Sequence, residues 1–314
     1  MSRIRALLLA TLAALVPLAD VFGATVFIHD FSRNPLDSHG NDPVFVVRGD
    51  ADGAFAHDPD SAPRLRGDRP GSLTVTYDSL QPTTRLMAPL AGSCGPIDDF
   101  VVGAVLTIRP GIDADPFGFH PIAFGLLNET TTGDDRTGDI DDFRADTFDT
   151  FEMAYFPNVS PQFGGPFLSA TAFGMPLGED AFSHFTFGSV PAGLAAGVTY
   201  LVQLEHRAAD HTLTLRVWSA GLQGQLIERL DARVVVSLSG LQGFDLASVG
   251  IFAYHDGFNL FASSGRSLLA TVDYDLLYAA TLEDGHLPQQ IATVLGRLGL
   301  GASRRVPILE QPPQ

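Results

Sequence analysis

Short runs in which apolar and polar residues alternate recur over residues 24–282, and this pattern constrains the fold more than any other feature of the sequence. In residues 71–78, Leu73, Val75 and Tyr77 share one parity, while Ser and Thr stand between them. Successive side chains of a β-strand point to opposite faces of its sheet. The alternation therefore predicts strands with one buried face, joined by turns at the intervening Gly, Pro and Asp residues.

Other runs extend this pattern along the chain. Residues 211–218 repeat it, whereas residues 101–108 are largely apolar at both parities, which predicts a central strand covered on both sides. One face of a late strand is expected to carry Val272, Tyr274, Leu276 and Tyr278. About a dozen or more such runs favour an all-β fold, a two-sheet antiparallel sandwich, over a helical or α/β fold.

The first 23 residues have the layout of a secretory leader. Arg3 and Arg5 precede an uncharged apolar stretch, Ala6–Leu18, which is shorter than the roughly 20 residues of a membrane-spanning helix. A cleavage after Gly23 is expected, and the mature protein is then secreted or periplasmic. The alternative is a retained anchoring helix.

The last segment, residues 283–314, differs from the strand-rich part. Residues 288–298 predict one short helix with Ile291, Val294 and Leu298 on one face, ended by glycines. A polar, Pro-containing tail follows. Because no long apolar stretch occurs here, we expect no membrane span in the mature chain.

Charge and cysteine usage exclude several classes. The formal net charge of the 314-residue chain is −17, which disfavours nucleic acid and anionic membranes as partners, since both require a basic surface. Cys94 is the single cysteine, so no internal disulfide can form and stability must come from burial of the core.

Four segments resemble the concanavalin A-like lectin and glucanase superfamily, especially its laminin-G-like members. They are Thr199–Trp218 (two strands and a short turn), Ser248–Gly257, Ala270–Ala279 and the opening segment His29–Asp37. The resemblance implies a jelly-roll sandwich over residues 24–282. That superfamily includes lectins, polysaccharide hydrolases and lyases, and modules that bind other proteins, and its members use the concave face of one sheet or the loops at its rim.

Asp149 and Glu152 are the candidate catalytic pair. Retaining glycosidases need two carboxyl groups about 5–5.5 Å apart, one as nucleophile and one as acid. Residues three apart point to opposite faces of a regular strand, so this pair requires a β-bulge to meet. Glucanases of the resembled superfamily instead carry their acids at alternating positions of one strand.

An acidic loop lies just upstream and is a candidate Ca²⁺ site. Ca²⁺ takes six to eight oxygen ligands, and members of the resembled superfamily carry calcium. The candidate ligands are Asp139, Asp141, Asp142 and Asp146. The alternative is a solvated acidic loop, because the spacing does not match an EF-hand.

Candidate ligand contacts are the side chains expected on a non-core face or at a strand end. The aromatic and Gly-rich residues 155–167 either form a stacking platform for a sugar ring or fill the core. The expected ligand-binding set is Glu152, Tyr155, Gln203, Arg216, Trp218, Tyr254, His255 and Asp256.

The sequence thus favours a secreted, non-catalytic binding module for polysaccharide or a cell-surface partner. A polysaccharide hydrolase or lyase using Asp149 and Glu152 is the first alternative, and a structural envelope or matrix protein is the second. No nucleotide-binding or serine-hydrolase motif is present in the sequence.

Overall fold

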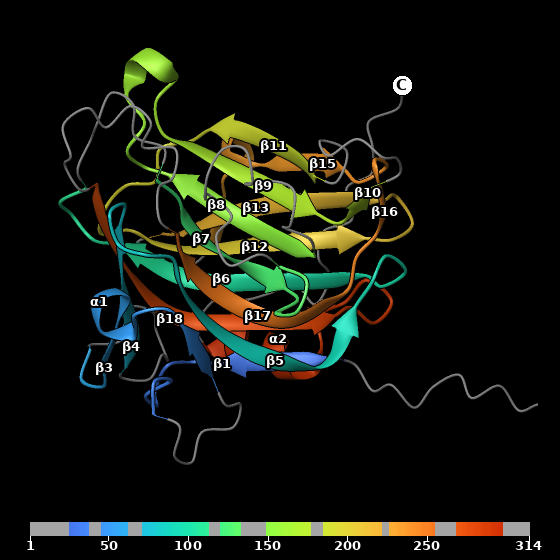
Figure 1. Ribbon diagram of the computed structural model, residues 1–314, viewed down its shortest axis with the longest axis horizontal. Helices are drawn as coiled ribbons and strands as arrows, with labels where there is room; N and C mark the ends of the chain where they lie inside the picture. The colour runs from blue at the N-terminus through green and yellow to red at the C-terminus, as the bar shows by residue number, and fades with distance from the viewer. Residues whose placement is uncertain are drawn as a thin grey trace, which may run out of the picture.

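The alternating runs form two antiparallel sheets that pack face to face, which confirms the predicted sandwich. Figure 1 shows the computed structural model, which describes residues 25–37, 45–61, 71–112, 120–132, 149–176, 185–221, 226–254 and 268–297. The predicted leader, residues 1–23, and the tail after residue 297 lie outside these segments.

The first sheet has nine strands. In spatial order they are β14 (Leu226–Glu228), β13 (Thr212–Ala220), β12 (Thr199–Arg207), β6 (Phe100–Ile108), β18 (Leu269–Thr281), β4 (Ser72–Asp78) and β3 (Phe55–Asp58), while β1 (Val26–His29) also pairs with β18 and β15 (Val234–Ser237) with β13.

The second sheet has seven strands. Their order is β11 (Phe185–Pro191), β9 (Phe167–Phe173), β8 (Thr150–Phe156), β7 (Ile122–Leu127), β17 (Leu246–Ala253), β5 (Thr84–Cys94) and β2 (Val46–Arg48). Outside the two sheets, the described elements are a small ribbon of β10 (Met175–Pro176) and β16 (Leu241–Gly243), helices α1 (Ala51–Ala54) and α2 (Gln289–Arg297), and 3-10 turns at Pro161–Phe163 and Leu230–Ala232.

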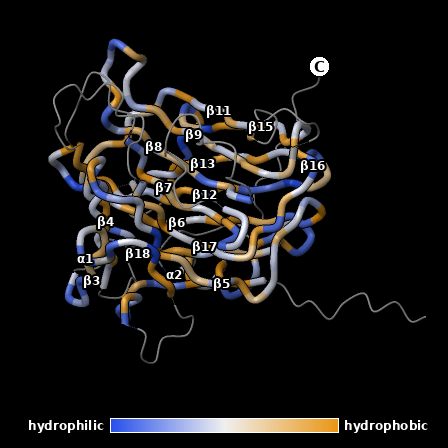
Figure 2. Tube along the Cα trace, in the orientation of Figure 1, coloured by the Kyte–Doolittle hydropathy of each residue, from blue (hydrophilic) through white to orange (hydrophobic). Residues whose placement is uncertain are grey.

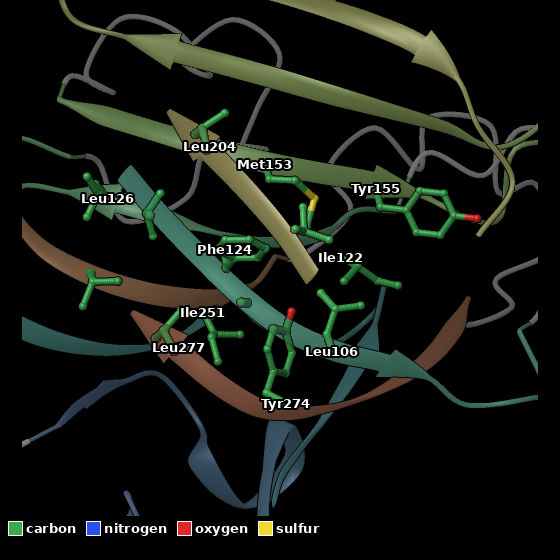
Figure 3. Packing of buried hydrophobic residues seen from close by; sticks show 14 of the residues in the cluster. Leu106, Ile122, Phe124, Leu126, Met153, Tyr155, Leu204, Ile251, Tyr274 and Leu277 are labelled. Carbon is green, nitrogen blue, oxygen red and sulfur yellow. The ribbon is translucent and has the colours of Figure 1, made fainter. Parts of the chain in front are cut away.

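The core lies between the sheets and is built from one parity of each strand. Figure 3 shows Leu106 and Leu204 of the nine-stranded sheet packed in the same cluster as Phe124, Met153 and Ile251 of the seven-stranded sheet. Along the chain, hydrophobic and hydrophilic residues alternate within the strands (Figure 2). As expected, Leu73, Val75 and Tyr77 of β4 are fully buried.

Strand β6 is the predicted central strand. It pairs with β12 on one side and β18 on the other, and all nine of its residues are buried. Its inner face joins the core, while Val101 and Val105 face outward into a second apolar cluster. The predicted helix α2 covers this outer face through Ile291 and Leu295.

The expectation that β18 keeps one face buried along its length is wrong. The register between β18 and β6 shifts between Tyr274 and Leu276, where a β-bulge places one extra residue in β18. Val272 and Tyr274 therefore face the inter-sheet core, whereas Leu276 and Tyr278 face the cluster under α2. The bulge lets one strand supply apolar side chains to both sides of its sheet.

Gly125 of β7 lies where the chain has no room for a side chain. A Cβ added to Gly125 would lie 2.0 Å from the carbonyl oxygen of Phe151 and 2.8 Å from the Cα of Glu152, both backbone atoms of β8. We predict that Gly125→Ala lowers the free energy of unfolding by about 2–4 kcal/mol, because backbone of two paired strands must separate. Urea denaturation measures this. Gly193→Ala is the matched control, since its Cβ meets nothing within 4 Å, and equal stability of the two variants would contradict the prediction.

Two buried histidines predict acid sensitivity. Burial, the largest cause, lowers the pKa of His29 from 6.5 to about 4, and burial also lowers the pKa of His206. As pH falls below 6.5, the unfolded chain takes up these protons and the folded chain does not, so stability decreases until the folded pKa is reached. The loss from His29 approaches about 3 kcal/mol near pH 4. Urea midpoints measured from pH 7.5 to 4.5 should fall less steeply in His29→Gln than in the wild type, and identical slopes would contradict this.

Candidate functional site

The structure distributes the predicted contact residues over the two opposite outer faces of the sandwich. Glu152 belongs to β8, and Tyr254 directly follows β17, both strands of the seven-stranded sheet. Gln203 lies on β12 and pairs across strands with Arg216 of β13, in the nine-stranded sheet. Because these sheets face each other through their cores, the two groups cannot contact the same small ligand.

The group on the nine-stranded sheet is packed rather than open. The side-chain amide of Gln203 donates a hydrogen bond to the Tyr278 hydroxyl, and Trp218 packs half-buried against the cluster under α2. Arg216 is 6 % exposed, and burial lowers the pKa of its guanidinium. These side chains mainly stabilise the outer layer of this sheet.

Asp149 and Glu152 take part in separate hydrogen-bond networks. Asp149 has a left-handed φ of 50° just before β8 and accepts hydrogen bonds from Thr131 Oγ1 (2.6 Å) and the backbone N–H of Asp245 (3.0 Å). Glu152 is fully buried and accepts from the Tyr254 hydroxyl at 2.7 Å. Each carboxylate therefore has a partner of its own: Asp149 fixes a loop at the rim, and Glu152 fixes Tyr254 on the sheet.

The remaining predicted residues lie in the core or outside the described segments. Tyr155 points into the core, is 2 % exposed and accepts a hydrogen bond from the N–H of Leu194 at 3.0 Å, so it shares no face with Glu152. His255 and Asp256 lie outside the described residues, as do the four candidate calcium ligands Asp139, Asp141, Asp142 and Asp146. Within the described segments, no three His, Cys, Asp or Glu side chains are placed to hold a metal ion.

An aromatic row that the sequence reasoning missed lies on the outer face of the seven-stranded sheet. Phe185 and Phe187 of the end strand β11 have parallel rings with centroids 5.9 Å apart, and Phe185 stacks on Phe173 of β9 at 5.6 Å. Exposure rises along this row from 1 % at Phe173 to 58 % at Phe187. The signal in the sequence was the alternation Phe-Thr-Phe, whose two rings share a face.

A second aromatic pair lies on the same face, farther along these strands. Phe156 of β8 and Phe167 of β9 stack at 4.5 Å, and the register pairs Phe167 with Pro191 of β11. Of the expected aromatic stretch, residues 155–167, these two rings reach the outer face.

Hydroxyl groups separate the two aromatic ends. The register places Ser169 of β9 opposite Ser189 of β11 and Thr171 opposite Phe187, and the hydroxyls of Ser169 and Thr171 lie 3.2 Å apart. We call this region the aromatic–hydroxyl surface; it comprises Phe156, Phe167, Ser169, Thr171, Phe173, Phe185, Phe187, Ser189 and Pro191. Its exposed part lies on β11, where Phe187, Ser189 and Pro191 share one face, whereas Ser169 and Thr171 are only 4 % and 5 % exposed. A ligand would meet a ring and the Ser189 hydroxyl, which both donates and accepts hydrogen bonds.

Comparisons with known proteins give structural likeness only. No family model matches the chain, and no curated protein matches it. Among solved structures it is similar to a peanut lectin with a bound nonapeptide, at a TM-score of 0.45 and 14 % identity over 82 % of this chain and 97 % of that chain. It is also similar to the Emp47p carbohydrate recognition domain, at a TM-score of 0.38 and 10 % identity over 73 % of this chain and 88 % of that chain.

A third likeness is to basic winged bean lectin with Tn-antigen, at a TM-score of 0.44 and 14 % identity over 82 % of this chain and 99 % of that chain. Legume lectins and a lectin-like domain are therefore among the structures that this chain resembles. Because these TM-scores are below 0.5, we describe the fold from the strand order of the two sheets alone.

Proposed function

We propose that this protein is a non-catalytic module that binds neutral polysaccharide or surface glycan through the aromatic–hydroxyl surface. The observation that carries the proposal is Phe187, a large ring that is 58 % exposed on the outer face of β11 and continues the stack of Phe185 and Phe173. The exposed Phe187 ring, with the exposed Ser189 two residues farther along the same face of β11, matches a sugar, which has apolar C–H faces and polar edges.

The charge of the protein supports a neutral ligand. The chain has a net charge of −17, and Glu152 of β8 pairs with Thr171, so it lies beside the aromatic–hydroxyl surface on the same face of the sheet. A polysaccharide rich in carboxylate or sulfate would be repelled by this field. Uncharged sugars are recognised by ring contact and hydrogen bonds, and so avoid that repulsion.

The position of the carboxylates favours binding over hydrolysis. A glycosidase needs two carboxyl groups on one scissile bond, whereas Asp149 bonds to Thr131 and Asp245, and Glu152 bonds to Tyr254. The proposal includes export, because residues 1–23 have the layout of a secretory leader. Among the described residues no helix is long and apolar enough to cross a bilayer. Ca²⁺ binding by the acidic loop remains a prediction.

Affinity electrophoresis in gels that contain a neutral polysaccharide tests the proposal. Barley β-glucan, galactomannan, dextran and soluble starch cover different linkages. We expect retardation by at least one of them, and Phe187→Ala should weaken this binding about fivefold to thirtyfold, since losing one stacked ring costs about 1–2 kcal/mol. Phe185→Ala should act in the same direction.

The matched control is Val235→Ala, which removes an apolar side chain that is 59 % exposed on the other sheet. It should bind like the wild type. Absence of retardation in every gel, or full binding by Phe187→Ala, would overturn the proposal.

A further inference from the structure

A hollow of about 470 Å³ opens at one end of the nine-stranded sheet, away from the strands that carry the aromatic–hydroxyl surface. It lies where β6 begins and where β12 and β18 end. Its lining residues are Ile97, Asp98, Asp99, Arg207, Thr281, Leu282, Asp284 and Gly285. Pockets for small ligands have volumes of about 300–1,000 Å³, so this hollow can accommodate a small organic molecule.

The guanidinium of Arg207 is fixed in this hollow by two carboxylates. Its Nε donates to Glu205 and its Nη1 donates to Asp99 Oδ2 at 3.0 Å, while Asp99 Oδ1 accepts the backbone N–H of Ala208 at 2.8 Å. These bonds leave Nη2 without a partner among the described residues. A Cβ on Gly285 would lie 2.9 Å from Nη1, so a side chain at this position would require the end of the arginine to shift.

The turn after β18 presents a second polar group. Glu283 and His286 exchange backbone hydrogen bonds of 3.1 and 2.9 Å, and the two residues between them, Asp284 and Gly285, have φ of 50° and 73°. This is the geometry of a tight two-residue hairpin turn, which Asp-Gly favours. The exposed carboxylate of Asp284 has no hydrogen-bond partner in the part of the chain that the structure describes.

The hollow therefore offers donors and acceptors side by side. A guanidinium can only donate hydrogen bonds, and an ionised carboxylate can only accept them. The lining holds three carboxylates, Asp98, Asp99 and Asp284, and one guanidinium, so an anion would be repelled. Asp98 and Asp99 already accept hydrogen bonds from within the chain, and a cation at Asp284 would share the hollow with the Arg207 guanidinium. A hydroxyl both donates and accepts, so a ligand with adjacent hydroxyls satisfies both groups at once.

Apolar side chains complete the lining. Ile97 is 89 % exposed at the edge of the hollow, and Leu282 lines it from the end of β18. An exposed isoleucine can pack against the C–H face of a ring while the hydroxyls face the charged groups. We propose that this hollow is a second binding site, which takes a small neutral polyhydroxylated ligand, a single sugar unit or the end of a sugar chain.

Calorimetric titration of the full chain with glucose, galactose, mannose and N-acetylglucosamine tests this site. We expect at least one of them to bind, and Asp284→Asn to weaken that binding at least fivefold. Asparagine tolerates positive φ, so this variant keeps the turn. Asp52→Asn, a substitution at an exposed aspartate on α1, should change nothing.

Charged sugars test the chemistry of the ligand. Glucuronate and glucosamine should both bind more weakly than the corresponding neutral sugar. Tighter binding of glucosamine would show a cation site and overturn the proposal, as would an absence of binding by all four neutral sugars or unchanged affinity in Asp284→Asn.

The same variants separate this site from the aromatic–hydroxyl surface. Phe187→Ala should retain the affinity of the hollow for its sugar while losing polysaccharide retardation, and Asp284→Asn should retain retardation. A negative binding result for one site therefore does not affect the result for the other site. If Phe187→Ala also abolished binding of the small sugar, the hollow would not be a separate site.

Discussion

Burial of β6 on both faces is the constraint on which the other features depend. Its inner side chains, such as Leu106, join the core between the sheets, and its outer side chains, such as Val105, need a separate cover. Helix α2 provides that cover, and Leu276 and Tyr278 of the neighbouring strand β18 belong to the same apolar cluster. Apolar burial is the main favourable term in folding, so both faces of β6 need an apolar layer against them. Around β6, the nine-stranded sheet is therefore the middle of three layers. Its outer face is thereby occupied by packing. The outer face of the seven-stranded sheet also carries a buried cluster, which includes Met87, Phe252 and Tyr254, and the exposed ring of Phe187 lies on its end strand β11.

Polar groups inside this sandwich are accommodated by pairing. The hydroxyls of Tyr77 and Tyr274 lie 2.7 Å apart between the sheets, and burial raises the pKa of both phenols, so they stay protonated. At the edge of the packed region, the partly exposed Arg109 makes a bidentate contact with the buried Asp273, with both bonds at 2.7 Å. Each pair satisfies groups that would destabilise the fold if left alone. Arg207 differs, because two of its nitrogens are held and the third is available for a ligand.

The sequence predicted the sandwich because period-two alternation reports directly which side chains share a face. It predicted β4, β6 and the β12–β13 hairpin for this reason, and α2 from the helical spacing of its apolar residues. It failed at β18, where the bulge near Asp275 reverses the parity of Leu276 and Tyr278, since a bulge leaves no mark on the pattern of apolar residues. It also placed Glu152, Gln203 and Trp218 in one binding site, which is wrong because they lie on different sheets. Parity indicates which face of a strand a side chain occupies but not which of two sheets the strand joins.

The residues that carry the proposed sites show what pattern reasoning can and cannot find. Phe185 and Phe187 look like core residues in a chain with 23 phenylalanines, and only the end position of β11 exposes them. The hollow at Arg207 depends on contacts between residues 99, 207 and 285, which are far apart in the chain. In both cases a strand end or sheet edge leaves side chains without a covering layer. In a sandwich whose core and much of both outer faces are occupied by packing, binding surfaces are expected at such places, where the pairing of strands stops.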